Sequence, residues 1–381
     1  MTGAASQRMR IAVLNRVFTP TAGGAERYSM ALVEQLAQAH EIHVFAQRIE
    51  HQWPGVTYHR VSAPLTRPRW INQIWYATAS WWATRRGFDI VHSHENTWHG
   101  QVQTVHVLPV KYNLFQGRSG WHLALRYLKV ATSPRLLTYL ALERLRFAPR
   151  RNKVMVLTSP TLQDFVRQVY PHCRMSVLAP GVDMPTRASD PQAARQRLAL
   201  PPAGRLLAFV ANDYQKKGLP TLLQALCQLP PDVNLAVVGN PASIEKFSRL
   251  AMSLGLEFRV HFLGHLKDVS PLYEAADLLV HPTLEDTFAM VVLEAMAHAL
   301  PVVVSDARYC GIAGLLSNGR NAMILSSPTD AGELAQTLAR VLSDDVLRQQ
   351  LAHAAHRFAQ QHAWPGVARE QTVIYRQLCA P

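Results

Sequence analysis

Short apolar runs alternate with longer amphipathic stretches along most of this chain. The apolar runs predict buried strands, and the stretches between them repeat with the period of a helix. Strands that alternate with helices predict parallel sheets covered by helices, which is an α/β fold. The strands expected in the first half are 10–15, 42–46, 56–61, 89–92, 103–106, 154–158 and 175–178, and those in the second half are 205–211, 235–239, 259–263, 278–281 and 301–304.

A turn-rich segment near the middle, APGVDMP at 179–185, separates two such alternations. A chain of 381 residues is long for one core and fits two domains. The expected fold class is α/β, with two doubly wound, Rossmann-like domains that face a central cleft. We expect the first domain over 1–183, the second over 184–362, and a C-terminal helix over 363–381 that can cross back to the first domain.

The composition is that of a globular protein. Hydrophobic residues make up 48% of the chain, yet no apolar run reaches the length of about 18 residues that a membrane span needs. The first ten residues lack the apolar core of a secretory signal. The four cysteines show neither metal nor disulfide spacing, which favours a reducing cytoplasm. They are Cys173, Cys227, Cys310 and Cys379.

The net charge of +13 lies entirely in the first half. Residues 1–185 carry 22 Lys and Arg against 9 Asp and Glu, whereas residues 186–381 carry 17 of each. This asymmetry predicts that the first half meets something anionic, either a membrane surface, an acidic substrate or nucleic acid.

The stretch 281–306 has the most informative chemistry in the chain. It places Asp286 and Glu294 around the start of a predicted helix, between two buried strands. In an α/β sheet the loop after a strand opens onto the ligand crevice, and the helix N-terminus there suits a phosphate. Glu294, about one turn further on, could accept both hydroxyls of a ribose. The stretch therefore predicts a sugar-nucleotide site; the alternative is a βαβ unit with an exposed acidic loop and one buried Glu.

Two other loops between a strand and a helix carry candidate phosphate contacts. Gly23 and Gly24 would let the backbone approach a ligand closely, although a tight turn explains the pair equally well. Lys216 and Lys217, in the loop that begins at Asn212, could neutralise a diphosphate as charge accumulates on it. The alternative is a solvated lysine pair, but cations near a helix start are mildly unfavourable.

Four histidines lie close together in the sequence: His92, His94, His99 and His106. A His-x-His at a strand end is compatible with zinc, but no third ligand has the right spacing. A polar strand end at the cleft is the favoured interpretation, in which His106 could hydrogen-bond a sugar hydroxyl. The first half has no Asp-x-Asp dyad after a strand, so a metal-held diphosphate is not favoured. We expect no metal and no cofactor.

The segment 111–153 combines ten basic residues with aromatic ones and holds a single acidic residue, Glu143. Basic and aromatic residues on one amphipathic helix suit an anionic membrane surface. The alternative is a solvated helical face that packs its leucines inward. A stretch upstream, from Arg67 to Arg86, repeats the theme. The ten basic residues are Lys111, Arg118, Arg126, Lys129, Arg135, Arg144, Arg146, Arg150, Arg151 and Lys153.

Several motifs together resemble the family 4 glycosyltransferases, which are retaining enzymes of the GT-B fold. They are the GGAER loop, the DIVHSH strand, the APGVD linker, the KKG loop, the VHFLGH strand, the Asp286/Glu294 motif and the LPVVVSD strand, in family order. The resemblance covers most of the chain and is more specific in the second half. It implies metal-independent transfer of a hexose from a nucleotide-sugar, with retained anomeric configuration.

The resemblance also implies roles for individual residues. Glu294 would hold the ribose and the lysine pair the diphosphate, while the glycine pair would approach the phosphates. His106 would sit near the transferred sugar, and the N–H groups of residues 288–291 would line the phosphate site. The predicted catalytic residues are His106, Lys217 and Asp286, and the predicted donor-binding residues are Gly23, Gly24, Asn212, Lys216, Lys217, Asp286, Phe288, Ala289, Met290, Val291 and Glu294.

The chain departs from the family pattern at four places. Asp286 stands where Glu is usual, and Thr287-Phe288-Ala289 replaces Gly-Phe-Gly. Asn212 stands in place of a phosphate-binding Arg, and Gly314 in place of a common Glu. The loop from Asn212 to the lysines and the basic aromatic segment look similar to the lipopolysaccharide core glucosyltransferase branch.

The resulting hypothesis is a glycosyltransferase that is peripheral on the cytoplasmic face of the cell membrane. It would move a hexose, expected to be glucose, from a UDP-sugar to a lipid-linked or lipopolysaccharide-core acceptor. One alternative is a UDP-sugar epimerase of the same fold, which would need catalytic acids that the sequence does not reveal. Another is a nucleic-acid-binding protein, suggested by the pI of about 9.9. The neutral second half argues against it, so we expect no nucleic-acid partner.

Overall fold

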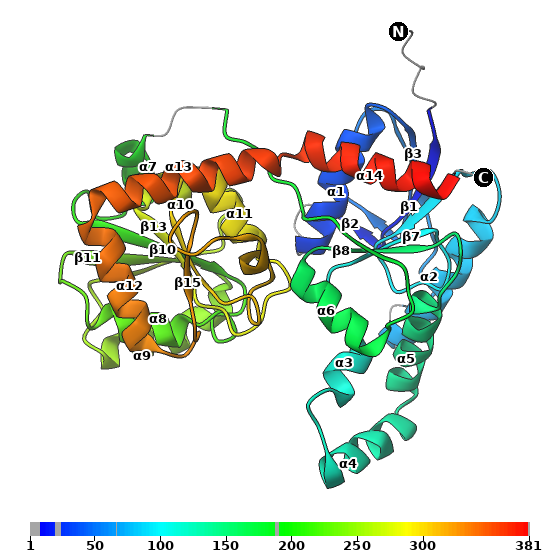
Figure 1. The fold of residues 1–381 in the computed structure, drawn as a ribbon, viewed down its shortest axis with the longest axis horizontal. Coiled ribbons are helices and arrows are strands. Elements are labelled where there is room, and N and C mark those ends of the chain that lie inside the picture. Colours follow the sequence, from blue (N-terminus) through cyan, green and yellow to red (C-terminus); the bar gives the residue numbers. More distant parts are fainter. Residues whose placement is uncertain (1–7, 20–23, 66, 187–189, 380–381) are drawn as a thin grey trace. The chain divides into compact units, whose positions relative to one another are not determined.

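The computed structural model describes residues 8–19, 24–65, 67–186 and 190–379. The chain divides into two compact units (Figure 1). Unit 1 contains residues 1–181 and 364–381, and unit 2 contains residues 182–363.

Unit 1 is built on a seven-stranded sheet with the order β5-β3-β1-β6-β7-β8-β9. All neighbouring pairs in this sheet are parallel. The chain order reverses between β1 and β6, which is where an open α/β sheet forms its ligand crevice. The strands are β1 (Arg10–Leu14), β3 (Glu41–Ala46), β5 (Val56–Arg60), β6 (Ile90–Ser93), β7 (Val102–Val105), β8 (Val154–Leu157) and β9 (Met175–Val177), while β2 (Val17–Phe18) and β4 (Arg48–Ile49) pair separately.

Helices cover both faces of this sheet, because successive side chains of each strand point to opposite faces. Ile11 and Val13 of β1 pack in the same core as α1 and α14, whereas Ala12 and Leu14 pack with Tyr76 of α2. The helices are α1 (Gly24–Ala37), α2 (Arg69–Thr84), α3 (Val110–Phe115), α4 (Gly120–Ala131), α5 (Pro134–Phe147), α6 (Pro160–Val169) and α14 (Trp364–Cys379).

The C-terminal helix α14 belongs to unit 1 and packs on α1 (Figure 1). Trp364 and Tyr375 are part of the core beneath it. Gly181 lies directly against the Trp364 ring, where a Cβ atom would come within 2.4 Å of the ring carbons. A larger residue at this position would push the helix away from the core.

Unit 2 repeats the same plan with six parallel strands in the order β12-β11-β10-β13-β14-β15. Its order reverses between β10 and β13. The strands are β10 (Arg205–Ala211), β11 (Val233–Gly239), β12 (Val260–Gly264), β13 (Leu278–His281), β14 (Val302–Ser305) and β15 (Met323–Leu325). The helices are α7 (Pro191–Arg197), α8 (Leu219–Leu226), η1 (Pro241–Ser243), α9 (Ile244–Ser253), α10 (Ser270–Ala275), α11 (Met290–Ala297), η2 (Gly311–Leu315), α12 (Ala331–Ser343) and α13 (Asp345–Gln361).

The prediction of two parallel-sheet, Rossmann-like domains is confirmed. Each predicted strand is present, with bounds that differ by at most two residues. The prediction that the basic segment 111–153 forms one amphipathic helix is wrong, because it contains the three helices α3, α4 and α5. In the described part of the chain, no helix combines the length and the apolar character that crossing a bilayer requires.

Candidate functional site

Two loops meet at the carboxyl edge of the unit 2 sheet, beside the reversal of strand order. One follows β10 and the other follows β13, and these two strands are neighbours. The Leu284 N–H donates to the Lys216 carbonyl oxygen at 2.9 Å. Gly218 has a φ of 82°, and a Cβ atom there would lie 1.9 Å from the Pro282 carbonyl oxygen. The loops therefore touch through their backbones, which requires glycine at this position.

An ion pair joins the same two loops. Lys217 Nζ lies 2.7 Å from Asp286 Oδ2, and it also donates to the Glu285 carbonyl oxygen at 2.7 Å. The two side chains are only 22% and 19% exposed. Burial acts to raise the pKa of Asp286, but His281 and the Lys217 charge outweigh it and hold that pKa well below its ordinary value. The carboxylate is therefore ionised at neutral pH.

The other oxygen of Asp286 organises the start of α11. Asp286 Oδ1 accepts the N–H groups of Phe288 at 3.2 Å and Ala289 at 2.8 Å. Two of the four N–H groups predicted to face a phosphate thus bond to Asp286 instead. The first residues of α11, Met290 and Val291, keep that role as a prediction.

Ala289 holds an uncommon backbone conformation just before α11, with φ 71° and ψ 71°. A residue with a Cβ atom seldom occupies this left-handed region, whereas glycine does so readily. The Gly-Phe-Gly of the family pattern, which Thr287-Phe288-Ala289 replaces in this chain, has a glycine at this position. The loop of this chain therefore keeps a glycine-type geometry with an alanine side chain.

Glu294 lies on α11 and is oriented by a neighbouring helix. Tyr273 Oη, from α10, donates to Glu294 Oε2 at 3.0 Å. The sequence did not indicate this partner, because its spacing of 21 residues matches no motif. His281 was also missed as a site residue: its side chain is 1% exposed, and Nε2 lies 3.4 Å from Asp286 Oδ2. The strand-end position of His281 was the one available signal.

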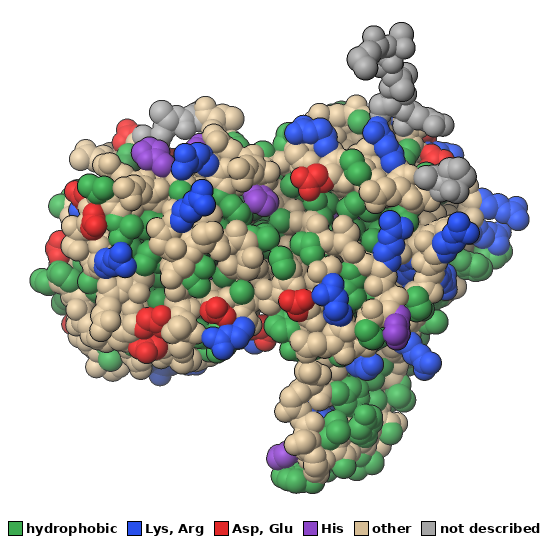
Figure 2. All heavy atoms as spheres, viewed as in Figure 1, with side chains coloured by type: hydrophobic (Ala, Val, Ile, Leu, Met, Phe, Trp, Pro, Cys, Tyr) green, Lys and Arg blue, Asp and Glu red, His purple; other side chains and the backbone are tan. Residues whose placement is uncertain are grey.

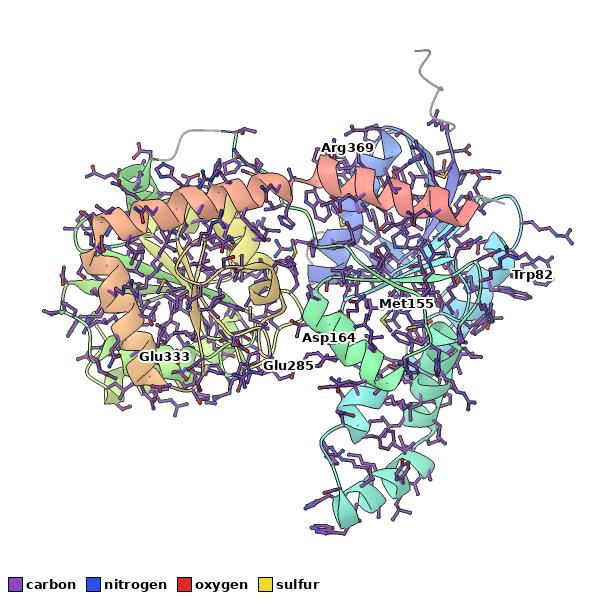
Figure 3. The ribbon with its side chains drawn as sticks, in the orientation of Figure 1. Trp82, Met155, Asp164, Glu285, Glu333 and Arg369 are labelled. Atoms are coloured by element: carbon purple, nitrogen blue, oxygen red, sulfur yellow. The ribbon has the colours of Figure 1, made fainter. Side chains whose placement is uncertain are left out.

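The two lysines of the loop after β10 differ in their surroundings. Lys217 is held by Asp286, whereas the Lys216 side chain is 61% exposed and lies 3.9 Å from Glu285. Asn212, directly after β10, is exposed. Figure 3 labels Glu285, which comes from the loop after β13. Unit 2 thus presents one lysine fixed in the site and one that extends into solvent.

Two of the predicted site residues of unit 1, Gly24 and His106, lie among the described residues. Gly23 falls outside the described residues, and Gly24 is the first residue of α1. His106 directly follows β7, and its Nε2 lies 3.1 Å from His94 Nδ1. His92 hydrogen-bonds Tyr375 Oη at 2.7 Å and Thr104 Oγ1 at 2.6 Å. These contacts hold the histidines in one polar cluster beneath α1 and α14.

Four buried histidines of unit 1, the three of this cluster and His99, are uncharged at neutral pH. Burial lowers the pKa of His92 and His106 to about 3 and that of His99 to about 4, and burial also lowers the pKa of His94 strongly. Such rings can donate or accept hydrogen bonds without carrying charge. Among the described residues, no group of three His, Cys, Asp or Glu side chains is placed to hold a metal ion.

Three charged residues of the segment 111–153 are buried, so two of its ten basic residues, Arg146 and Lys153, do not face solvent. Arg146 is 7% exposed and donates to Gln103 Oε1 at 3.1 Å. Lys153 is 5% exposed. Glu143 accepts the Lys111 N–H at 2.9 Å, at the start of α3. Arg146 holds the segment to the body of unit 1 through Gln103 and the Thr104 carbonyl oxygen, because a buried charge needs partners.

The remaining part of this segment forms an arm with exposed apolar side chains. In Figure 1, α3, α4 and α5 project from the rest of unit 1, and Figure 2 shows hydrophobic side chains over the free end of the arm. Trp82 of α2 is 62% exposed and points outward in Figure 3. The exposed large apolar residues of α4 are Trp121, Leu125, Tyr127 and Leu128.

Two family descriptions match the chain, one in each unit. Residues 22–184 match the model described as Glycosyltransferase Family 4, and residues 190–358 match the model described as Glycosyl transferases group 1.

Individual relatives agree with these matches. Lipopolysaccharide glucosyltransferase WaaG of Escherichia coli K12 is 31% identical over 233 residues, which are 58% of this chain and 61% of that protein. D-inositol 3-phosphate glycosyltransferase of Corynebacterium urealyticum is 29% identical over 221 residues, which are 54% of this chain and 51% of that protein. The chain thus spans about half to three fifths of the length of these relatives.

Solved structures share the fold. The crystal structure of WaaG superposes with a TM-score of 0.79 at 23% identity, over 96% of this chain and 99% of that chain. Anabaena Alr3699/HepE in complex with UDP and glucose gives a TM-score of 0.73 at 20% identity, over 97% of this chain and 100% of that chain. The two α/β units of this chain therefore have the GT-B fold of these structures.

Proposed function

The chain belongs to glycosyltransferase family 4, and from this we propose that it transfers glucose from UDP-glucose to a lipid-linked acceptor such as a lipopolysaccharide core. The similarity to a lipopolysaccharide glucosyltransferase supports the acceptor class. A fold shared with a protein solved in complex with UDP and glucose is compatible with the donor.

One observation carries the proposal: the loops after β10 and β13 meet at the carboxyl edge of the unit 2 sheet, beside its reversal of strand order, and carry charged residues. Lys217 and Asp286 form an ion pair there, and Glu294 is oriented by Tyr273. Lys216 extends from the same loop. This is the place where open α/β sheets bind nucleotides.

Each group has a proposed task in donor binding. Glu294 accepts the two ribose hydroxyls, for which a carboxylate held by a tyrosine is well suited. Lys216 and the first N–H groups of α11 neutralise the diphosphate. Lys217 fixes Asp286, and together they face the sugar end of the donor. His106 of unit 1 contacts a sugar hydroxyl as a neutral ring.

The proposed reaction retains the configuration at the anomeric carbon. The bond between this carbon and the β-phosphate oxygen breaks, and the acceptor oxygen forms its new bond on the same face. The acceptor proton passes to the departing phosphate. The lysines stabilise the charge that develops on UDP as it leaves, and no protein nucleophile is required.

Unit 1 is the proposed acceptor and membrane side of the protein. Its exposed aromatic and leucine side chains on α2 and α4 lie among basic residues, a combination that suits an anionic lipid surface. We therefore place the protein at the cytoplasmic face of the cell membrane, as a peripheral protein.

The test is a transfer assay with labelled UDP-glucose and a delipidated or lipid-linked core acceptor. Glu294→Gln keeps the side-chain size and removes the charge, so we expect the transfer rate to fall by about tenfold to a hundredfold. Glu257→Gln is the matched control, since Glu257 is exposed elsewhere in unit 2. Full activity in Glu294→Gln would overturn the assignment, and conversion of UDP-glucose without any acceptor would favour an epimerase.

A further inference from the structure

An open cavity of about 700 Å³ lies in unit 1, outside the residues assigned above to the donor. Its walls come from two places that are distant in the sequence: the start of α2 and the first half of α5. The lining residues are Arg67, Pro68, Arg69, Trp70, Arg135 and Tyr139. We call it the arginine cavity.

Hydrogen bonds fix the two walls to the carboxyl edge of the sheet. Gln73 of α2 donates to the Asn96 carbonyl oxygen at 3.1 Å. Asn96 in turn donates through Nδ2 to the Tyr139 carbonyl oxygen of α5 at 3.5 Å. Asn96 follows β6, one of the two strands at the reversal of strand order. The cavity is therefore built at the edge of unit 1 where α/β sheets bind ligands.

The cavity concentrates positive charge without a carboxylate to balance it. Three of its lining residues are arginines, and none is acidic. Within the described ranges, no carboxylate forms an ion pair with Arg67, Arg69 or Arg135. In unit 2, by contrast, Arg195 and Arg205 share Asp277 at 3.0 Å and 3.1 Å. All three arginines are exposed, and their planar guanidinium groups can bind an anion through paired, charge-assisted hydrogen bonds.

The size and the rings of the cavity favour more than a bare anion. A volume of about 700 Å³ is far above the roughly 30 Å³ that one water occupies, and it lies within the range of small-molecule sites. Trp70 and Tyr139 add apolar ring surface beside the arginines. This combination matches a ligand with a charged group and a ring of polar and apolar faces, which describes a phosphorylated sugar.

We propose that the arginine cavity binds a phosphate-bearing sugar of the acceptor. The arginines hold the phosphate and the two aromatic rings contact the sugar. The inference rests on the proposed function, because it assigns the acceptor to unit 1, and it deepens that function by requiring a phosphorylated acceptor glycan rather than a neutral one.

The experiment is a calorimetric titration of the full chain with glucose 6-phosphate as the probe and glucose as its neutral counterpart. We expect wild type to bind glucose 6-phosphate and not glucose. Arg69→Gln/Arg135→Gln should weaken this binding by at least about tenfold, because the variant loses two charged hydrogen-bond donors to the phosphate. The control Arg60→Gln/Arg174→Gln removes the same charge from exposed sites of unit 1 outside the cavity.

Several results would overturn the inference. They are the absence of glucose 6-phosphate binding by wild type, an equal loss in both double variants, and full competition of the probe by UDP. Donor binding is measured in parallel by titrating UDP. If UDP does not bind while glucose 6-phosphate does, the proposed function fails and the cavity assignment stands.

A second arm separates a glycan phosphate from a lipid headgroup. Flotation with phosphatidylcholine vesicles, with and without phosphatidic acid, reports on a phosphate presented by a membrane. We expect Arg69→Gln/Arg135→Gln to lose the sugar phosphate and to change vesicle recovery no more than the control double variant does. A specific loss of phosphatidic acid binding, with sugar phosphate binding retained, would assign the cavity to lipid and contradict the proposal.

Discussion

Both units are built on a parallel sheet whose strand order reverses, but they differ in how their charged residues are paired. Both reverse their strand order in the middle of a parallel sheet, at β1/β6 and at β10/β13. Unit 2 balances its charges: Lys217 is paired with Asp286, and Arg195 with Asp277. Unit 1 keeps an excess of exposed cations, while the histidines at its sheet edge are buried and neutral.

The chemistry of each unit therefore resides in the loops at its sheet edge, because the scaffolds beneath them are similar. Balanced, hydrogen-bonded charge suits a small donor whose diphosphate must be held in one orientation. Unbalanced surface charge suits partners that bring their own negative charge, such as a phosphorylated acceptor or a membrane. Four experiments test this contrast between the units.

The largest effect should come from breaking the ion pair of unit 2. In Lys217→Ala the Asp286 carboxylate loses its partner, and the leaving phosphate loses a nearby cation. We expect kcat to fall by about 10²–10³-fold and the free energy of unfolding to fall by about 1–3 kcal/mol. Steady-state transfer kinetics and urea unfolding measure the two quantities.

The adjacent lysine is the matched control for this variant. Lys216→Ala removes an equal charge from an exposed side chain, so transfer should fall less and stability should change little. An equal loss of kcat in both variants would contradict a special role for the buried pair.

The next largest effect should come from acidification, which should destabilise unit 1 more than unit 2. Burial holds the pKa of His92 and His106 at about 3 and that of His99 at about 4, while an unfolded histidine titrates near 6.5. Between pH 6.5 and 4 the unfolded chain therefore binds protons that folded unit 1 does not bind. The free energy of unfolding of unit 1 should fall as the pH falls, by up to about 1.4 kcal/mol per pH unit for each histidine.

Unit 2 should resist the same change. Its histidines with a lowered pKa, His261 and His298, are only half-buried. The depressed pKa of Asp286 means that its contribution to stability is lost only below about pH 3.9.

Hydrogen exchange, corrected for intrinsic rates, measures this difference between the units. From pH 7 to pH 5, the protection of β6 and β7 should fall more than the protection of β10 and β13. His92→Gln should flatten the pH slope of unit 1 and the exposed His122→Gln should not; equal pH slopes in both units would refute the contrast.

A membrane-binding test should give an effect of intermediate size. Trp121→Ala/Leu128→Ala removes two exposed apolar side chains from α4, and about tenfold weaker recovery on anionic vesicles is expected. Met252→Ala/Phe258→Ala removes exposed apolar groups from unit 2 and serves as the control. Similar losses in the two double variants would mean that vesicle binding is not a property of the arm.

The smallest effect is expected in the loop before α11, where Ala289 holds a left-handed backbone conformation. Ala289→Gly relieves a φ of 71°, so it should stabilise unit 2 by up to about 1 kcal/mol. Ala299→Gly, at a φ of 56° outside this loop, tests whether glycine stabilises the protein at any alanine with a positive φ. Thermal unfolding measures both. A loss of stability in Ala289→Gly alone would show that the alanine methyl contributes packing that outweighs the backbone strain.

Much of the fold was predictable because buried parallel strands have continuous apolar sequences. The strands 205–211 and 278–281 were predicted with their observed bounds. Three short strands, β2, β4 and β15, were missed; β2 and β4 have only two residues each, which give no measurable period. The predicted loops of unit 2 do meet at one sheet edge, because the strands that precede them are neighbours.

The fates of individual charges were not predictable, because they depend on tertiary partners. Nothing in the local sequence distinguishes the buried Arg146 from the exposed Arg144, and the contacts of Arg146 with Gln103 and Thr104 explain the difference. Tyr273 and Glu294 come from different helices, as do Arg69 and Arg135 of the arginine cavity. The sequence indicated which loops carry charged or polar residues, whereas the partners of these residues are seen only in the structure.

The most direct test of the account is where UDP binds. Calorimetric titration of UDP into wild type, Glu294→Gln and Arg69→Gln/Arg135→Gln compares the two units in one measurement. We expect UDP affinity to fall by at least about tenfold in Glu294→Gln and to stay at the wild-type value in the double variant of unit 1. Unchanged affinity in Glu294→Gln, or a loss in the arginine variant, would contradict the assignment of the donor to unit 2.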